Sequence, residues 1–437
     1  MLKELDVRGD LEKSISEYLP RPFSKENNEE IVAVVKGIIE EVRKRGDEAL
    51  YEMTERFDGS RPRTLSVGRQ EMENALEQIS PELRAALEKA AENVRTYYSK
   101  HDLSGQEIIR DGMSIKSRLL PLRSAGCYVP GGKASYPSTV IMTAIPAEMA
   151  GVERIVVAVP PNPDGRISQS VLAAAAIAGV QEVHPIGGAQ AIAALAYGTE
   201  KVEPVDVIVG PGNIYVSLAK QEVSSKVRVP ASFAGPSEVV VVADETASPD
   251  LVALDLIVQA EHGPDGLSWL VTWEKKFAEK VYSEITKMLE TSIRKEEIES
   301  TLSRSGYCVL VEGPEQALEV VDIVAPEHLQ IMTHNPEIMA GKVKNAGAIF
   351  CGSWSPATLG DYIAGPSHVL PTAGTARFSG ALSVSDFLKE VHMISASKET
   401  ISALGKHAVV LAETEGLDAH AESIRRRIKK IAEEENE

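Results

Sequence analysis

One of the nine histidines of this chain lies beside a glutamine at the end of a helical segment. In the string Gln259-Ala-Glu-His262-Gly263 the two side chains are three positions apart, so they share one face of a helix that Gly263 can end. Nitrogen and oxygen donors at this spacing can bind a metal ion. The alternative is polar capping of the helix end, which is the commoner use of such residues.

An acid and an imidazole stand side by side in the string Pro326-Glu327-His328. Histidine titrates near neutral pH and burial shifts a glutamate in the same direction, so the pair could supply two proton-transfer groups to one site. The alternative is a histidine that satisfies carbonyl groups at the end of the preceding helical segment. The sequence leaves both interpretations open.

Two further strings combine a carboxylate with an imidazole, namely Gly360-Asp361 followed by His368, and Glu415-Gly-Leu-Asp-Ala-His420. Carboxylate oxygen and imidazole nitrogen both suit Zn²⁺, although Asp after Gly is also a common turn residue. The sequence does not show that the candidate donors meet. If they do, they form one nitrogen and oxygen ligand set: Gln259, His262, Asp361 and His420.

Three glycine-containing turns follow strand-like segments, at Tyr128-Val-Pro-Gly-Gly, Gly187-Gly-Ala-Gln190 and Gly210-Pro-Gly-Asn213. Backbone amides at strand ends and helix starts suit phosphate groups, but the GxGxxG fingerprint of dinucleotide-binding proteins is missing. The turns could equally be tight connections between strands and helices. Cys127, next to Tyr128, suggests a thiol nucleophile, but a cysteine within a strand is more often a small apolar core residue.

The elements that must position these residues follow an alternating pattern. Helical periodicity marks residues 30–45 and 81–98, the latter with Ser80 and Pro81 as helix-start signals. Strand-like runs are predicted at 125–129, 154–159, 182–186 and 205–209, and helices at 137–150, 168–178, 189–197 and 213–220. Such a repeat favours a parallel sheet that helices cover on both faces.

A second series follows, which predicts a second α/β unit. Its strand-like runs are 239–242, 269–272, 308–311 and 348–350, separated by helical segments at 250–261, 276–289 and 314–323. Residues 352–380 have little periodicity and predict a long loop, which is more often functional than idle in a globular protein. Residues 417–430 predict a final helix.

Composition excludes several classes of protein. The chain has 437 residues with 46 Lys and Arg against 64 Asp and Glu, and a net charge of −18 argues against a nucleic-acid partner. The longest apolar run, 171–180, is about half of the ~20 residues that span a membrane, so no membrane partner is expected. The three cysteines form no CxxC pair, and the start lacks a secretory signal, so we expect a reduced, cytoplasmic protein.

Over nearly its whole length the chain resembles the histidinol dehydrogenase family. The matching strings, in their expected order, are Tyr128-Val-Pro-Gly-Gly, Tyr136-Pro-Ser-Thr-Val, Gly187-Gly-Ala-Gln-Ala-Ile-Ala-Ala-Leu-Ala-Tyr-Gly-Thr, Gly210-Pro-Gly-Asn, Ala234-Gly-Pro-Ser-Glu-Val, Gln259-Ala-Glu-His-Gly, Pro326-Glu-His-Leu, Gly360-Asp-Tyr with His368-Val-Leu-Pro-Thr, and Glu415-Gly-Leu-Asp-Ala-His. The resemblance implies NAD-dependent oxidation of L-histidinol to L-histidine through L-histidinaldehyde, in histidine biosynthesis.

The resemblance also implies roles for individual residues. His328 matches a general base, and Glu327 matches the residue that activates water. The implied Zn²⁺ ligands are Gln259, His262, Asp361 and His420, which together with Glu327 and His328 also contact the substrate. Further substrate contacts match Ser237, His368 and Glu415, and NAD contacts match Tyr128, Gln190 and Asn213.

In the family the fold is α/β, with two incomplete Rossmann-like parallel-sheet units, helical N- and C-terminal segments, and a domain-swapped homodimer. The resemblance therefore implies that Glu415 and His420 reach the active site of the partner subunit. The expected organisation is an N-terminal segment 1–23, a discontinuous first unit 24–127 and 238–381, an inserted unit 128–237, and a helical dimerisation tail 382–437.

Three rival functions remain to be separated from this one. A zinc hydrolase would use the same ligands to hold a water, with Glu327 as its base. A relative of the family could oxidise another amino alcohol, although the presence of Glu327, Glu415 and His368 argues against that change. A binding protein for small ligands would show affinity without turnover.

Overall fold

The computed structural model describes residues 2–9, 28–132, 134–230, 237–261 and 266–435, which form two units. The first unit contains residues up to Ser99 and Leu122–Phe387. The second contains Lys100–Pro121 and Leu388–Glu437. None of the described helices is long and apolar enough to cross a membrane.

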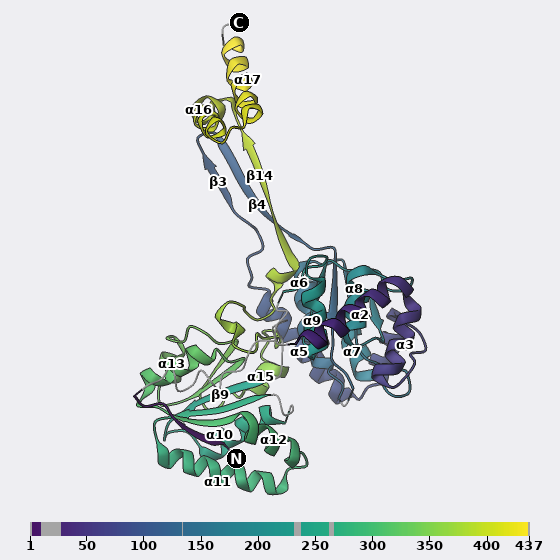
Figure 1. Cartoon of the computed structure of the whole chain (residues 1–437), viewed down its shortest axis with the longest axis vertical. Helices are drawn as coiled ribbons and strands as arrows, with labels where there is room; N and C mark the ends of the chain where they lie inside the picture. The colour runs from purple at the N-terminus through teal and green to yellow at the C-terminus, as the bar shows by residue number, and fades with distance from the viewer. Residues whose placement is uncertain (1, 10–27, 133, 231–236, 262–265, 436–437) are drawn as a thin grey trace. The chain divides into compact units, whose positions relative to one another are not determined.

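A five-stranded sheet holds the first βα series (Figure 1). Its order is β2-β7-β6-β5-β8, with every pair parallel except β2 with β7. The strand bounds are β2 Val67–Gly68, β5 Ser124–Tyr128, β6 Arg154–Ala158, β7 Glu182–His184 and β8 Val207–Val209. Its helices are α6 Pro137–Ala150, α7 Gln169–Ile177, α8 Gly188–Tyr197 and α9 Ile214–Val223. The predicted strands and helices of this series are confirmed, and β2 is an addition.

Helices from the first hundred residues pack on the helices that cover this five-stranded sheet. They are α2 Glu29–Arg45, α3 Asp47–Asp58, α4 Arg69–Gln78 and α5 Pro81–Tyr98. Helix α2 packs on α8 and α9, α4 on α7, and α5 on α6. The structure therefore differs from the expected assignment of residues 24–127 to the other α/β unit, because the apolar face of α2 joins the core around β5 and β6.

A six-stranded, fully parallel sheet holds the second series, in the order β1-β11-β10-β9-β12-β13. Its strands are β1 Lys3–Asp6, β9 Glu238–Ala243, β10 Leu267–Thr272, β11 Gly306–Leu310, β12 His328–Met332 and β13 Ala348–Cys351. The N-terminal segment, expected to stand apart, contributes β1 as an edge strand beside β11. Strand β12 was not predicted, because the polar residues His328 and Gln330 interrupt its apolar pattern.

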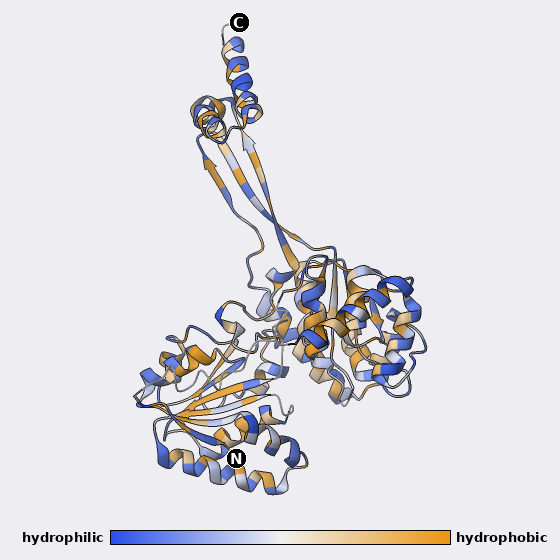
Figure 2. Cartoon of the chain, in the orientation of Figure 1, coloured by the Kyte–Doolittle hydropathy of each residue, from blue (hydrophilic) through white to orange (hydrophobic). Residues whose placement is uncertain are grey.

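Helices cover both faces of this sheet because its strands are apolar on both faces (Figures 1 and 2). Val239 and Val241 pack against α10 Pro249–Ala260, α11 Lys275–Thr291 and α12 Lys295–Ser305. Val240 and Val242 point to the opposite face, toward α13 Pro314–Val324 and α14 Pro336–Ala340. The parallel arrangement and the two-sided cover were predicted and are confirmed.

The segment predicted as a long loop contains a short helix, α15 Ala357–Tyr362, and a 3₁₀ turn at Thr375–Arg377. A second 3₁₀ turn, Val384–Phe387, ends the first unit. The prediction of an unstructured segment was therefore wrong at residues 357–362. A helix of six residues is too short for the helical periodicity to be visible.

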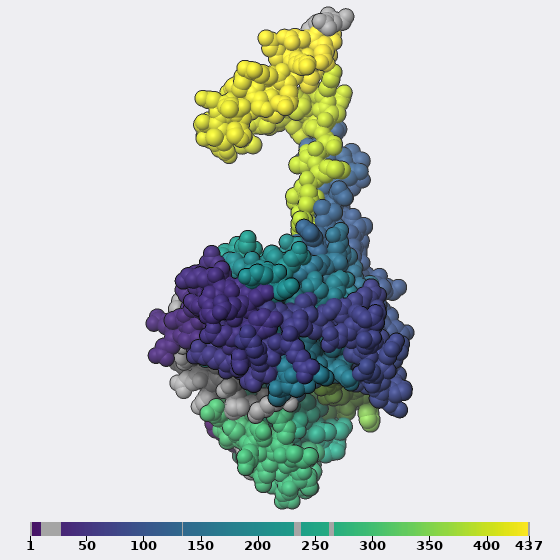
Figure 3. All heavy atoms as spheres, turned by 90° about the vertical axis from the view of Figure 1, so that its right-hand side faces the viewer, coloured from purple at the N-terminus to yellow at the C-terminus, as the bar shows by residue number. Residues whose placement is uncertain are grey.

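The second unit combines an antiparallel sheet with two helices. The sheet has the order β14-β4-β3, from β3 Glu107–Arg110, β4 Met113–Pro121 and β14 Leu388–Ala396. Helices α16 Lys398–Thr414 and α17 Asp418–Glu434 have yellow atoms in Figure 3. They pack closely at Gly405, where a Cβ atom would lie 3.0 Å from Ile424. The final helix was predicted, whereas the sheet was not, and residues 100–121 group with the tail rather than with 24–99.

Candidate functional site

The adjacent acid and imidazole lie at the start of β12, beside the start of β9. Helix α13 ends at Ala325, which adopts a left-handed conformation with φ of 48°, and the chain then enters β12 at His328. In the parallel register His328 lies opposite Val239, so Glu238 and Glu327 also become neighbours. The site is therefore built at the amino ends of two central strands.

Hydrogen bonds with the backbone of Glu238 fix both candidate catalytic side chains. The backbone N–H of Glu238 donates to Glu327 Oε2 at 2.9 Å, and its carbonyl oxygen lies 3.0 Å from His328 Nδ1. Because a carbonyl oxygen only accepts, His328 Nδ1 carries the proton and donates it. Nε2 is then the basic nitrogen of the neutral ring. The structure thus replaces the helix-capping alternative for His328 with an inter-strand contact.

Carboxylates surround this histidine. Glu327 Oε2 lies 3.4 Å from His328 Nδ1, and Asp361 Oδ1 lies 3.5 Å from Nε2. Burial disfavours the charged imidazole, but the charge of Glu327 and the bond with Asp361 outweigh it and hold the pKa of His328 well above its ordinary value. The ring also stacks on Phe350, with 6.0 Å between centroids and 29° between planes.

Glu238 is a buried acid that sequence analysis missed. Burial first, and the neighbouring charge of Glu327 second, raise the pKa of its carboxyl to about 8. Its Oε1 accepts a hydrogen bond of 2.9 Å from the backbone N–H of Ala373, and its buried Oε2 has no partner among the described residues. An acid directly before the apolar run Val239–Val242 was the available signal, because charged residues are rarely buried at the start of a central strand.

Asp361 and His368 come together through the short helix α15. His368 Nδ1 lies 2.8 Å from the backbone oxygen of Asp361, and its Nε2 lies 3.2 Å from Thr139 Oγ1 at the start of α6. Burial lowers the pKa of His368 below its ordinary value. The neighbouring Ser367 donates to the carbonyl of Met142 at 2.9 Å. These bonds connect the segment after α15 to the helix that covers β5 and β6.

The predicted metal ligands are described only in part. Gln259 lies in the last turn of α10 and is 1% exposed, and neither its Nε2 nor its Oε1 has a hydrogen-bond partner in the described part of the chain. His262 lies outside the described residues. Among the residues that the structure describes, no three His, Cys, Asp or Glu side chains are grouped as a metal site. The amide of Gln259, which has no partner among the described residues, nevertheless fits a site in which its oxygen binds a metal ion.

The remaining predicted substrate and metal residues belong to two different units. Ser237 precedes β9, and its carbonyl accepts a bond of 3.1 Å from Leu267 at the start of β10. Glu415 follows α16, and His420 lies in the first turn of α17, both within the second unit and both exposed. Each of these two side chains is therefore accessible on the surface of its own unit.

The three predicted NAD contacts line one cavity of about 480 Å³ at the carboxyl end of the five-stranded sheet. The Tyr128 hydroxyl accepts from the backbone N–H of Gly188 at 3.1 Å, and Asn213 caps α9 by accepting from Val216 at 3.1 Å. Gln190 is 1% exposed, and its Nε2 lacks a partner among the described residues. The glycine turns thus meet at one site, because parallel strands end at the same edge of a sheet.

One glycine of these turns is required by close packing of the backbone. Gly210 has a φ of +105°, and a Cβ atom there would lie 2.0 Å from the carbonyl oxygen of Tyr128. The buried ammonium of Lys220 donates to the Gly210 carbonyl, and burial lowers its pKa to about 7. Sequence analysis missed Lys220 because nothing in its local pattern shows that it is buried.

Cys127 is fully buried, and burial is the main reason that its pKa is raised to about 12. These properties fit a small apolar core residue rather than a thiol nucleophile.

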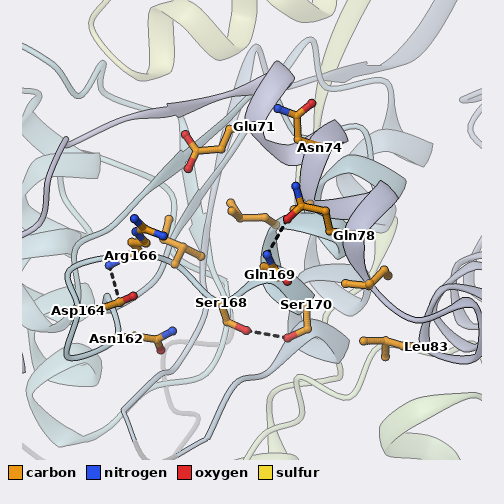
Figure 4. Close-up of a pocket in the computed structure, with 14 residues that line it drawn as sticks. Glu71, Asn74, Gln78, Leu83, Asn162, Asp164, Arg166, Ser168, Gln169 and Ser170 are labelled. Carbon is orange, nitrogen blue, oxygen red and sulfur yellow. Dashed lines mark hydrogen bonds between the residues drawn. The ribbon is translucent and has the colours of Figure 1, made fainter.

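A larger cavity of about 700 Å³ involves none of the predicted residues (Figure 4). It lies where α4 faces the start of α7, and Gln169 donates to Gln78 across it at 2.8 Å. Ser168 and Ser170 bond to each other at 2.9 Å on one side. Its lining side chains Glu71, Asp164 and Arg166 are exposed, so this cavity is an open surface hollow.

Comparison with known proteins assigns the family. The model of the histidinol dehydrogenase family matches residues 22–428. Histidinol dehydrogenase from Hydrogenovibrio crunogenus is 46% identical over 407 residues, which cover 92% of this chain and 94% of that protein. The protein of the same name from Pseudomonas syringae pv. tomato is 49% identical over 395 residues, covering 90% and 88%.

A solved structure agrees with this assignment. The crystal structure of histidinol dehydrogenase from Elizabethkingia anophelis is 32% identical, covers 99% of each chain and superposes with a TM-score of 0.91. The α/β class with parallel sheets and helical terminal segments is thereby confirmed. Together, the family match and these relatives confirm the resemblance of the sequence: the chain belongs to the histidinol dehydrogenase family.

Proposed function

We propose that this chain oxidises L-histidinol to L-histidine in two NAD-dependent steps, with His328 as general base and Glu327 as the group that activates water. Membership of the family makes the chain an oxidoreductase of histidine biosynthesis. The observation that carries the proposed roles is the buried Glu327 and His328 pair, which Glu238 holds at the amino ends of β9 and β12.

The first oxidation needs a base for the hydroxyl proton of the substrate. His328 donates through Nδ1 to Glu238, so Nε2 is left to accept that proton as hydride leaves the carbinol carbon. The neutral ring is the active form. Asp361 and Glu327 both favour the protonated ring, and engagement of Asp361 by a metal would remove one of these two influences.

The second oxidation needs water to add to the aldehyde. Glu327 suits this role because the N–H of Glu238 fixes the orientation of its carboxylate, and the side chain is 8% exposed. A carboxylate held next to an imidazole can take a proton from water while the imidazole is protonated. The two adjacent residues thus divide the alcohol and the aldehyde chemistry between them.

Gln259, His262, Asp361 and His420 would hold Zn²⁺, which orients the imidazole and amino groups of the substrate when it is bound. The amide of Gln259, which has no partner in the described part of the chain, supports this assignment, as does the choice of donors. Ser237, His368 and Glu415 would contact the substrate. Tyr128, Gln190 and Asn213, which share one cavity, would contact NAD, the hydride acceptor.

We also propose a homodimer with shared active sites, in which Glu415 and His420 act on the partner subunit. A mixture of His420→Ala and His328→Ala subunits tests this arrangement, because one of the two sites in a mixed dimer would then be intact. Recovered activity supports shared sites, while an inactive mixed dimer of normal stability contradicts them.

Two variants test the division of roles. Glu327→Gln should oxidise L-histidinol once and then stop, so that one NADH forms per substrate and L-histidinaldehyde is trapped by a hydrazine reagent. His328→Asn should slow oxidation of the alcohol by ~10²-fold or more, the usual range for loss of a general base. Glu319→Gln, an exposed acid on α13, is the matched control. Equal loss of both steps in Glu327→Gln would contradict the assignment.

A further inference from the structure

The cavity that contains Tyr128, Gln190 and Asn213 also contains an acid with no assigned role, Asp58. It is the last residue of α3 and the single charged residue among the described residues that line the cavity. Its Oδ2 is shielded from solvent and has no hydrogen-bond partner among the described residues. Burial raises the pKa of this carboxyl to about 6.

An acid is unfavourable at this position for two physical reasons. The carboxyl end of a helix carries partial negative charge, which disfavours a second negative charge there. The shielded Oδ2 also loses its hydration, and no hydrogen bond from the described residues replaces it. Unsatisfied buried groups of this kind need a separate explanation, and a ligand that donates hydrogen bonds supplies one.

The surroundings of Asp58 indicate what such a ligand would be. A Cβ atom placed on Gly187 would lie 3.2 Å from Asp58 Oδ1, so the carboxylate borders the turn that leads into α8. Gln190 adds to the same cavity a buried amide nitrogen that has no partner among the described residues. Val34, Phe57 and Tyr215 add apolar surface and are 51%, 47% and 40% exposed. A flat apolar ring joined to a group with several hydroxyl donors matches this combination.

We propose that Asp58 accepts hydrogen bonds from the hydroxyl groups of the adenosine ribose of NAD, and that it selects NAD over NADP. The inference rests on the proposed placement of NAD in this cavity. Two carboxylate oxygens match two neighbouring hydroxyl donors, as acids do in other dinucleotide sites. A 2′-phosphate would remove one donor and place negative charge against the carboxylate, which costs affinity.

Equilibrium binding to the full-length protein tests the proposal without turnover. Calorimetric titration would compare NAD, NADP and nicotinamide hypoxanthine dinucleotide, which lacks the adenine amino group. Asp58→Asn keeps the size of the side chain and removes its charge, and Asp58→Ala removes both. Glu55→Gln is the control, because Glu55 is an exposed acid on the same helix. Thermal unfolding of each variant would verify folding.

We expect Asp58→Asn to weaken NAD binding by about 10- to 100-fold, the range for hydrogen bonds to a charged group. NADP binding should stay unchanged or improve, so that the preference for NAD falls by at least tenfold. The hypoxanthine analogue should lose affinity in parallel with NAD. Glu55→Gln should match the wild type for all three dinucleotides.

Other outcomes overturn the inference in distinguishable ways. If Gln190→Ala weakens NAD binding but Asp58→Asn does not, the cavity holds NAD and only the role of Asp58 is wrong. A loss of NAD affinity with an unchanged NAD preference, or insensitivity of the hypoxanthine analogue to the variant, would mean that the carboxylate does not bind the ribose. If neither Gln190→Ala nor Asp58→Asn changes NAD binding, the placement of NAD in this cavity fails as well.

Discussion

Gly360 lies against the ring of Phe350, which stacks on the candidate base His328. A methyl group added at Gly360 should therefore displace the base indirectly, through that ring. A Cβ atom on Gly360 would lie 2.6 Å from Phe350 Cζ and 2.8 Å from Cε1. Carbon atoms pack best at about 3.5–4.0 Å, so the ring would have to retreat by roughly 1 Å. Phe350 stacks on His328, and therefore the displacement reaches the imidazole.

The expected effect on activity is larger than the effect on stability. Alanine is favoured over glycine in a helix by about 1 kcal/mol, which offsets part of the ~1–3 kcal/mol cost of overpacking. A misplacement of ~1 Å can lower a rate by ~10²-fold. Gly360→Ala should therefore lower kcat/KM for L-histidinol by about 10- to 100-fold, while the free energy of unfolding changes by less than ~2 kcal/mol.

A double-mutant cycle shows whether Phe350 transmits the effect. Phe350→Leu removes the ring atoms that the new methyl group would meet, so Gly360→Ala should cause little further loss in that background. Gly380→Ala is a neutral control, because a Cβ atom there has no described atom within 4 Å. Steady-state kinetics and urea unfolding of the four proteins provide the data. An equal loss with and without the Phe350 ring would show that the ring does not transmit the effect of the added methyl group.

Three further predictions concern buried polar groups. Gln259→Leu should stabilise the metal-free protein by about 1–3 kcal/mol in urea unfolding, because it removes two amide atoms that have no partner among the described residues. The same variant should weaken zinc binding. Destabilisation of the metal-free protein would mean that the amide has partners. Lys220→Met should weaken NAD binding measured by calorimetry, since the Gly210 turn loses its anchor, and an unchanged affinity would contradict this role. Burial lowers the pKa of Lys220 from 10.5 to about 7, so between these pH values the folded protein binds fewer protons than the unfolded chain. The free energy of unfolding of the wild type should therefore fall as the pH decreases from 10.5 to about 7. Urea unfolding of Lys220→Met across this range should lack the part of the pH dependence that comes from Lys220.

Local patterns in the sequence predicted the elements that are apolar on both faces. The strand at 239–242 is a run of four valines, and the strand at 125–129 consists of small and apolar residues followed by Val129. Both lie inside their sheets, with a strand on either side. Strand β12 was missed because its residues His328 and Gln330 are polar yet buried. Their burial results from pairing with the neighbouring strands, which the local sequence does not show. Strands β4 and β14 pair at Met113 with Ala396, and such a pairing between distant segments leaves no local signal.

The candidate site was predictable to a similar extent. A sequence shows directly that two proton-transfer residues are neighbours, as Glu327 and His328 are, and that a glycine turn follows a strand, as at Gly210. Both features were found. Glu238 and Lys220 were missed because their importance comes from burial, and Asp58 because one of its oxygens is shielded; both depend on packing between segments. The meeting of Gln259 with the other proposed metal ligands stays a prediction.

Counting the NADH formed per L-histidinol consumed tests the central claim most directly. The zinc-loaded protein would be assayed by NADH absorbance together with the remaining substrate, before and after chelation and after zinc is restored. We expect two NADH per L-histidinol, loss of activity with chelator and recovery with zinc. A folded, zinc-loaded protein that forms no NADH from L-histidinol, or that forms only one per substrate with histidinaldehyde as its product, would contradict this expectation.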